Sequence, residues 1–227
     1  MSRTQLHLVY ALAAAFAASE ARSTVMIFDE TGKAQKIEAK PESSSRKKKT
    51  ETSDEVNKIC NRGLLKLQSG RWLEAVVDFD KAISLNRKYA PAYVNRGVAR
   101  AKQGMFKQAI ADYERALAID PDLAVAFHSR GLAHEGLQEH DKALADFTSA
   151  VTCDPSFEHG WVKRARSLTR LKRYGEAIDD YSKAIALNPT NHLAFHNRGV
   201  CYINLGKKPE AQADLEKAKE IEAAEKK

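Results

Sequence analysis

The chain has 227 residues, 43% of them hydrophobic and 30% charged, which is enough apolar material to bury a core. Its 37 basic and 30 acidic residues leave a net charge of +7 that is spread along the chain, unlike the dense basic stripe of a nucleic-acid-binding protein. The three cysteines, Cys60, Cys153 and Cys201, cannot all pair and show no CxxC or Cys/His spacing, which excludes a fully paired disulfide framework and a zinc finger.

The first 21 residues have the parts of a secretory signal peptide. Arg3 precedes an apolar run over residues 8–18, and the small residues Ser19 and Ala21 suit a cleavage site. The run is too short to span a bilayer, which needs about 20 residues. We therefore expect residues 1–21 to direct export to the periplasm, the exterior or a lumen. An organelle transit peptide and an ordinary N-terminal helix are the alternatives, the latter in a cytoplasmic protein.

Residues 22–55 separate this segment from the rest of the chain. Runs at 24–28 and 34–39 flank Thr31-Gly32 and predict a small hairpin. An isolated hairpin is marginal in water, and whether it docks onto the protein's own binding surface stays open. Residues 41–55 lack large apolar side chains and predict a flexible linker. An alternative reading of the basic run 46–49 is a nuclear or anionic-surface signal.

From residue 56 onward the sequence repeats with a period of 34 residues. Arginines recur every 34 residues, and three further sets of equivalent residues keep the same period. A fixed period in this range is the signature of stacked repeats, here over units 56–89, 90–123, 124–157, 158–191 and 192–227. The four columns are Arg62, Arg96, Arg130, Arg164, Arg198; Ala75, Ala109, Ala143, Ala177, Ala211; Asp78, Asp112, Asp146, Asp180, Asp214; and Ala82, Ala116, Ala150, Ala184, Ala218.

Each unit contains two apolar stretches with the three-to-four spacing of a helix, separated by a short link such as the one at Gly70. The fold predicted is all-α, an α-solenoid of antiparallel helix pairs. Small residues near Gly63 and its equivalents should let the two helices approach closely. We expect the aromatic residues that recur at this period to fill the space between units; they are Phe79, Tyr113, Phe147 and Tyr181. We expect Pro121, Pro155 and Pro189 to stop the second helix and to occupy the first turn of the next helix.

At this point the chain resembles the tetratricopeptide repeat (TPR) family. Position 1 of the five units is Val56, Ala90, Ala124, Glu158 and His192. In this numbering the family pattern has an aromatic residue at position 4, Gly at 8, a large residue at 17, Ala at 20, an aromatic residue at 24, Ala at 27 and Pro at 32. The second unit matches throughout, and the fourth has Ala at position 8: Tyr93, Gly97, Phe106, Ala109, Tyr113, Ala116, Pro121; Trp161, Ala165, Tyr174, Ala177, Tyr181, Ala184, Pro189.

The first, third and last units depart locally from this pattern. Ile59 and Arg87 replace an aromatic and Pro, Gln138 and His140 replace the turn Gly and a large apolar residue, and the last unit has Lys208, Leu215 and Ala223. The polar tail of the last unit suits a terminal repeat whose outer face meets water.

The arginines at position 7 and the aspartates at position 23 lie on different helices of the pattern. We predict a ladder of Arg–Asp pairs within or between units. A ligand-binding role for the arginine column is the alternative.

The resemblance implies a protein or peptide partner held in a concave groove lined by the first helices. Asparagines at position 6 could grip a peptide backbone, apolar residues at position 9 could floor pockets, and a basic cluster in the fourth unit would favour an acidic group. The alternative is that these are solvated helix faces. The candidates are Asn61, Leu64, Asn95, Val98, His128, Leu132, Lys163, Arg166, Arg170, Asn197 and Val200.

Other sites are disfavoured by residue spacing. No register of three units offers the Lys, Asn and Arg set of the chaperone-tail carboxylate clamp. His192 and His196 share a helix face without an evident third ligand, so we expect no metal, no cofactor and no enzymatic activity. The sequence thus predicts a scaffold that binds an extended or helical protein segment. The alternatives are an accessory subunit of an enzyme, and binding of an anionic polymer or nucleic acid through the linker and the cluster of Lys163, Arg166 and Arg170.

Overall fold

The computed structural model describes residues 24–28, 34–38 and 48–225, in two compact units divided after Glu51. In the first unit, β1 (Thr24–Phe28) pairs antiparallel with β2 (Ala34–Glu38), with Val25 opposite Ile37. This confirms the predicted hairpin. The proposed signal peptide and its cleavage site lie outside the described residues.

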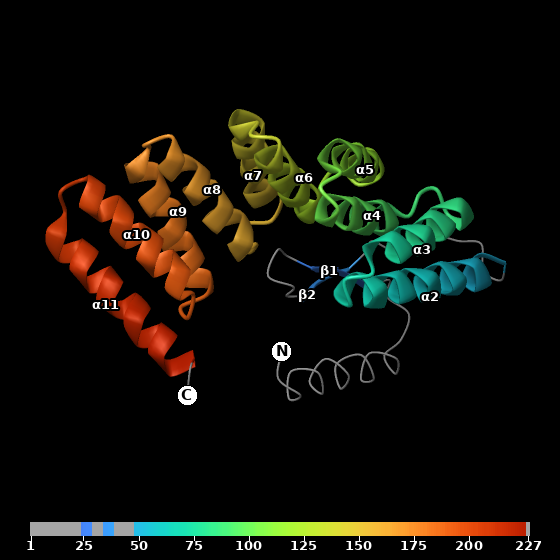
Figure 1. The fold of residues 1–227 in the computed structure, drawn as a ribbon, viewed down its shortest axis with the longest axis horizontal. Coiled ribbons are helices and arrows are strands. Elements are labelled where there is room, and N and C mark those ends of the chain that lie inside the picture. The colour runs from blue at the N-terminus through green and yellow to red at the C-terminus, as the bar shows by residue number, and fades with distance from the viewer. Residues whose placement is uncertain (1–23, 29–33, 39–47, 226–227) are drawn as a thin grey trace. The chain divides into compact units, whose positions relative to one another are not determined.

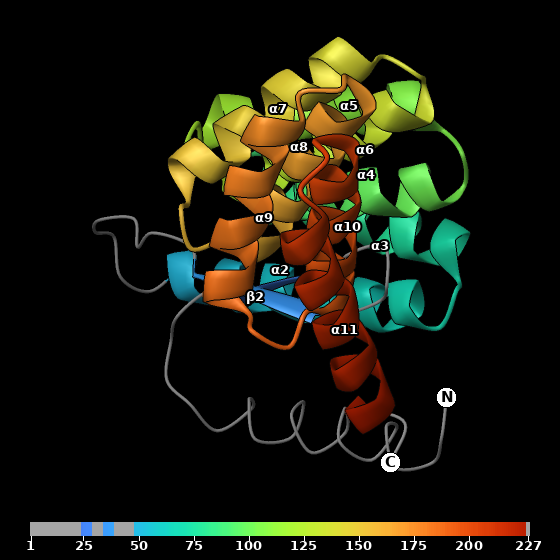
Figure 2. The ribbon, with the colours of Figure 1, turned by 90° about the vertical axis from the view of Figure 1, so that its left-hand side faces the viewer.

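The second unit is all-α in its described residues and forms the predicted solenoid. The helices follow one another as antiparallel pairs, and each pair packs on the next in chain order (Figure 1; Figure 2). The ten helices are α2 (Lys48–Gln68), α3 (Trp72–Leu85), α4 (Ala90–Lys102), α5 (Phe106–Ile119), α6 (Ala124–Gly136), α7 (His140–Cys153), α8 (Glu158–Arg170), α9 (Tyr174–Leu187), α10 (His192–Asn204) and α11 (Lys208–Glu225).

The first helix begins earlier than the sequence indicated. Residues 48–55 were expected to belong to the flexible linker, but α2 starts at Lys48. This stretch contains neither proline nor glycine, so nothing in it stops a helix that is continued back from Val56.

The turn within each pair uses a left-handed residue at position 15. Gly70, Gly104 and Gly206 adopt φ of 75°, 76° and 74°, and the third and fourth pairs place Gln138 and Lys172 there at 62° and 60°. Side chains rarely adopt this conformation, so the missing glycines carry a small cost in backbone strain.

The prolines at position 32 do not occupy the first turn of the next helix. The second helices end at Ile119, Cys153 and Leu187, and the next begin three residues after the proline. An Asp or Asn before each proline accepts a hydrogen bond from the backbone two residues on, as Asp154 does from Ser156 at 2.9 Å. This Asx-turn makes a separate corner between pairs, which corrects the prediction.

The aromatic side chains at position 24 lie within their own helix pair. A Cβ added to Gly97 would meet the Tyr113 ring at 2.6 Å, and one added to Gly131 would meet Phe147 at 2.7 Å. The aromatic column therefore fills the gap between the two helices of a unit, where we had expected it between units. Because Tyr113 is buried here, the pKa of its hydroxyl is raised.

All five predicted Arg–Asp pairs are present, which confirms the ladder. Each arginine bonds the aspartate sixteen residues later in its own pair, at 2.5 to 3.0 Å. The aspartates are almost fully buried, at 2–6% exposed. A buried carboxylate without a cation is strongly destabilising, so this pair fixes the first helix against the second.

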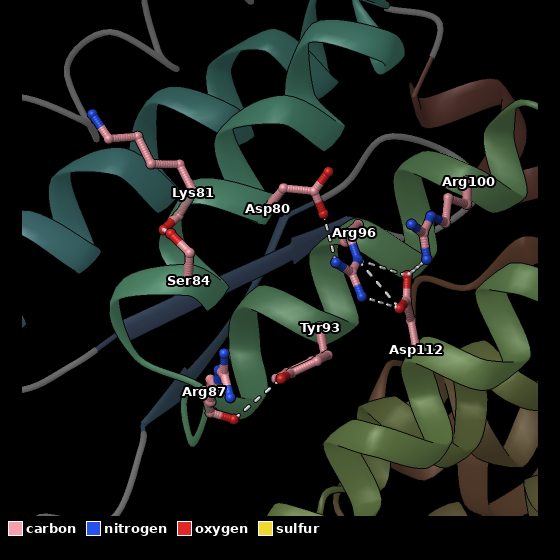
Figure 3. A network of polar contacts seen from close by, with 8 residues as sticks. All are labelled: Asp80, Lys81, Ser84, Arg87, Tyr93, Arg96, Arg100 and Asp112. Atoms are coloured by element: carbon pink, nitrogen blue, oxygen red, sulfur yellow. Dashed lines mark hydrogen bonds and ion pairs between the residues drawn. The ribbon is translucent and has the colours of Figure 1, made fainter.

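Further cations reinforce the ladder. Arg96 also reaches Asp80 of the preceding pair at 2.5 Å, and Arg100 bonds Asp112 at 2.8 Å (Figure 3). In the first pair, hydrogen bonds from Arg62 and Lys66 hold the pKa of Asp78 below its ordinary value. The ladder thus acts within units and, at Arg96, between them.

The pairs are joined by apolar contacts between a second helix and the following first helix. One core cluster includes Val151 of α7, Leu168 of α8, Tyr181 of α9, and Ala194 and Cys201 of α10. Positions 3 and 10 of the first helices are small in units two to five, and this lets the preceding helix approach them.

We predict that Gly97→Ala destabilises the protein by about 1–3 kcal/mol, because the new methyl group would overlap the buried Tyr113 ring. Gly175→Ala is the matched control, since nothing lies within 4 Å of its added Cβ in helix α9. Urea unfolding followed by circular dichroism measures both. Equal effects of the two substitutions would contradict the close approach.

Candidate functional site

The eleven candidate residues lie on the first helices of the five pairs, α2, α4, α6, α8 and α10. Positions 3, 7 and 10 of these helices face the preceding pair in units two to five, as the burial of Ala92 and Ala99 shows. The candidates occupy positions 5, 6, 9 and 13, on another side of the same helices. We call these eleven residues the A-helix face.

The asparagines at position 6 differ in their surroundings. Asn61 is exposed and Asn197 is half-buried, whereas Asn95 is only 1% exposed. Neither the Nδ2 nor the Oδ1 atom of Asn95 has a hydrogen-bond partner among the residues that the structure describes. Buried polar groups without partners are rare in proteins and call for an explanation, such as a ligand that the amide is meant to bind.

The apolar positions lie deep in the surface. Leu64 and Val98 are 6% and 8% exposed, and Leu132 and Val200 are half-buried. These side chains therefore lie within the surface of the first helices rather than project from it.

His128 is embedded among aromatic rings. Its ring centroid lies 5.7 Å from that of Phe147 and 5.0 Å from that of Phe157. Only 4% of its surface is exposed, so the residue contributes packing to the face.

The basic residues of the fourth unit are not simply a free positive cluster. Arg166 and Arg170 both contact Glu135 of the preceding unit, at 3.3 and 2.6 Å. The Glu135 side chain is 10% exposed, while the two arginines remain 42% and 48% exposed. Lys163, the third member, is 5% exposed. An internal carboxylate therefore already bridges two of the three basic residues.

Glu135 is not one of the eleven candidate residues. It stands at position 12, and it meets positions 9 and 13 of the next unit across an interval of 31 and 35 residues. An acidic residue about one repeat before a basic pair was the available signal. One donor of Arg166, its Nε, is buried without a partner and faces no carboxylate of the described chain.

Within the described residues, no group of three or more His, Cys, Asp and Glu side chains is placed to hold a metal ion. The helices among these residues also include none long and apolar enough to cross a membrane.

Family comparison agrees with the repeat geometry. Profiles described as "Tetratricopeptide repeat" match residues 90–123 and 193–225, and one described as "TPR repeat" matches 63–104 and 165–206. The chain belongs to the tetratricopeptide repeat family. Proteins of this family generally mediate protein–protein interactions. No significant match is found among curated proteins.

Solved structures share the fold at low sequence identity. A crystal structure of MamA is 21% identical, with a TM-score of 0.65 over 72% of this chain and 95% of that one. YrrB, described as a TPR protein with an unusual peptide-binding site, is 23% identical, with a TM-score of 0.60 over 76% of this chain and 89% of that one. Neither is described as an enzyme, and identities this low establish the fold alone.

We predict that Glu135→Gln weakens the junction between the third and fourth pairs, because Arg166 and Arg170 lose their shared carboxylate. The partly exposed arginines limit the loss in unfolding free energy to about 1 kcal/mol. Urea unfolding at low and high salt measures it, and the difference from wild type should shrink with salt. Substitution of the exposed Glu210 by Gln is the control, and an equal loss there would contradict the bridge.

Proposed function

We propose that this TPR protein is a scaffold that binds an extended segment of a partner protein along its A-helix face. The observation that carries the proposal is Asn95, whose buried side-chain amide finds no hydrogen-bond partner for either polar atom within residues 24–28, 34–38 and 48–225. The family's general role in protein–protein interaction supports a protein ligand.

The chemistry of Asn95 matches that of a peptide group. A side-chain amide offers both donors and an acceptor, as a backbone peptide unit does, so the two can form paired hydrogen bonds. Leaving such a group buried and unsatisfied costs about 1–3 kcal/mol, which a bound backbone would recover. Both polar atoms are shielded from water in the free protein, so binding requires a rearrangement of the covering side chains that opens the amide to the ligand. Asn61 and Asn197 occupy the same position in the first and last units, and they would bind the same extended segment of the ligand.

The fourth unit adds a preference for an acidic side chain. Arg166 and Arg170 share one carboxylate, Glu135, so the pair of cations still carries excess positive charge. Their exposed outer surface suits a ligand carboxylate. Apolar ligand side chains would rest on Leu64, Val98 and Leu132.

The rival proposal, binding of an anionic polymer or nucleic acid, has weaker support. It rests on the basic linker and on the cluster of Lys163, Arg166 and Arg170, and Glu135 lowers the net charge of that cluster. Phosphate-driven binding would fall steeply with added salt, whereas a surface with apolar contacts would not.

We predict that Asn95→Ala weakens binding of peptides selected from a displayed random library about tenfold, the loss of about two net hydrogen bonds. The stability of the free protein should stay unchanged or rise, because the substitution removes an unsatisfied buried group. Calorimetric titration and urea unfolding measure the two effects separately.

The control is Asp179→Ala, an exposed position of α9 away from the A-helix face, which should leave peptide affinity unchanged. A single-stranded DNA oligonucleotide serves as the second probe. Tight, salt-sensitive DNA binding with no selectable peptide would reject the proposal in favour of its rival.

We propose in addition that the mature protein is exported after cleavage behind Ala21, on the strength of the n-region and apolar run of residues 1–21. N-terminal sequencing of the protein purified from its native cells should then begin at Arg22. Recovery of an intact Met1 would contradict export.

A further inference from the structure

The first and last helix pairs each have a surface that is exposed at the end of the array but buried at the junctions between pairs. Residues of these two end surfaces match one another in apolar character and in charge. Inside the array, positions 3, 7 and 10 of a first helix are covered by the preceding pair. In the first unit these positions are Lys58, Arg62 and Leu65, and all three are exposed. Leu65 is 59% exposed, whereas its equivalents Ala99, Ala133 and Cys201 are at most 1% exposed.

The opposite end carries a shallow hollow between α10 and α11 of about 370 Å³. Its lining includes Ile203, Ala211, Leu215 and Glu216. These residues lie where a sixth helix pair would pack, at the end of the molecule that faces the viewer in Figure 2. The hollow is deepened because Leu215 stands where units one to four have a ring.

Contacts at three pairs of repeat positions give the register that one copy would need to stack on another. Thr169 at position 12 contacts Cys201 at position 10 of the next unit, with Oγ1 and Sγ 3.3 Å apart. Arg198 at position 7 donates to Ser182 at position 25 of the preceding unit at 2.9 Å, and Arg96 reaches Asp80 in the same way (Figure 3). Val151 at position 28 lies against Gly160 at position 3.

Applied to the two ends, this register brings apolar groups together and opposite charges together. Position 12 of the last unit is Ile203, 54% exposed, and it would meet Leu65. Position 25 of the last unit is Glu216, and it would pair with Arg62, whose side chain is 55% exposed against 15% for Arg96. The Arg62–Glu216 pair would reproduce the Arg96–Asp80 ion pair inside the array, whereas Leu65 and Ile203 would replace the hydrogen bond of Thr169 and Cys201 by an apolar contact.

We propose that this protein self-associates head to tail, with α2 of one copy packing on α10 and α11 of the next. Such an interface is heterologous, so it forms open chains or closed rings rather than a twofold dimer. One contact is unfavourable, because Lys219 at position 28 of the last unit would meet Lys58, which carries the same charge. Gln212 also replaces the apolar residues found at position 21 elsewhere. The association is therefore weak and concentration-dependent.

The test is sedimentation equilibrium of the full chain over a concentration series. Wild type should form species larger than a dimer as concentration rises. Leu65→Glu and Ile203→Glu should each weaken association about tenfold or more, the effect of failing to bury one large apolar side chain. Leu73→Glu is the matched control, since Leu73 is 71% exposed on α3 but lies at none of the contact positions.

Mixing the two variants distinguishes this arrangement from others. Each variant keeps one intact end, so an equimolar mixture should form a one-to-one dimer and nothing larger. Lys219→Glu should tighten association, because a like-charge contact with Lys58 becomes an attraction. A wild type that stays monomeric together with Lys219→Glu, or a mixture that fails to pair, would overturn the proposal. Circular dichroism of each variant confirms that the fold is kept.

Discussion

The structure of the repeat domain depends on five buried carboxylates, each of which needs a cation. The aspartates at position 23 are nearly inaccessible to water, and the arginines at position 7 satisfy them from the neighbouring helix. A bidentate pair of this kind has a demanding geometry, so it fixes the rotation of the first helix as well as its distance. Arg164 also lies 4.8 Å from the centroid of the Trp161 ring, and this further limits its orientation.

The rotation of the first helix decides which of its sides faces neither the second helix of its own pair nor the preceding pair. One side faces the second helix of the same pair, where Gly97 lies against Tyr113, and a second side faces the preceding pair. The A-helix face is what remains. Asn95 lies there next to Arg96, which anchors the helix, so the position of its amide is fixed.

Much of this was readable from the sequence, because a strict 34-residue period carries both the element order and the register. The period predicted the helix pairs, the Arg–Asp ladder and the family. It did not reveal that Glu135 bridges Arg166 and Arg170, since that contact depends on how far one unit is displaced along the next. It also misplaced the prolines, because an Asx-turn and a helix start share the same Asp-Pro signal. The start of α2 at Lys48 was not predicted, because a charged stretch without proline or glycine is compatible with either a helix or a linker.

The two proposals use different parts of the first helices, so they are compatible. End-to-end stacking would use Arg62, Leu65 and Ile203, whereas ligand binding would use Asn61, Asn95 and Asn197. Stacked copies would present successive A-helix faces, and a partner with several binding segments would then bind with higher avidity.

The most direct test of the account is site-specific photo-crosslinking in the native cells. A benzophenone amino acid placed at Asn61 or Asn197 samples the A-helix face, and one placed at the exposed Ala145 or Asp179 samples the second helices. If the A-helix face binds the partner, protein adducts form from the first two positions and none from the other two. Adducts that form only from Ala145 and Asp179, or only with nucleic acid, would contradict this.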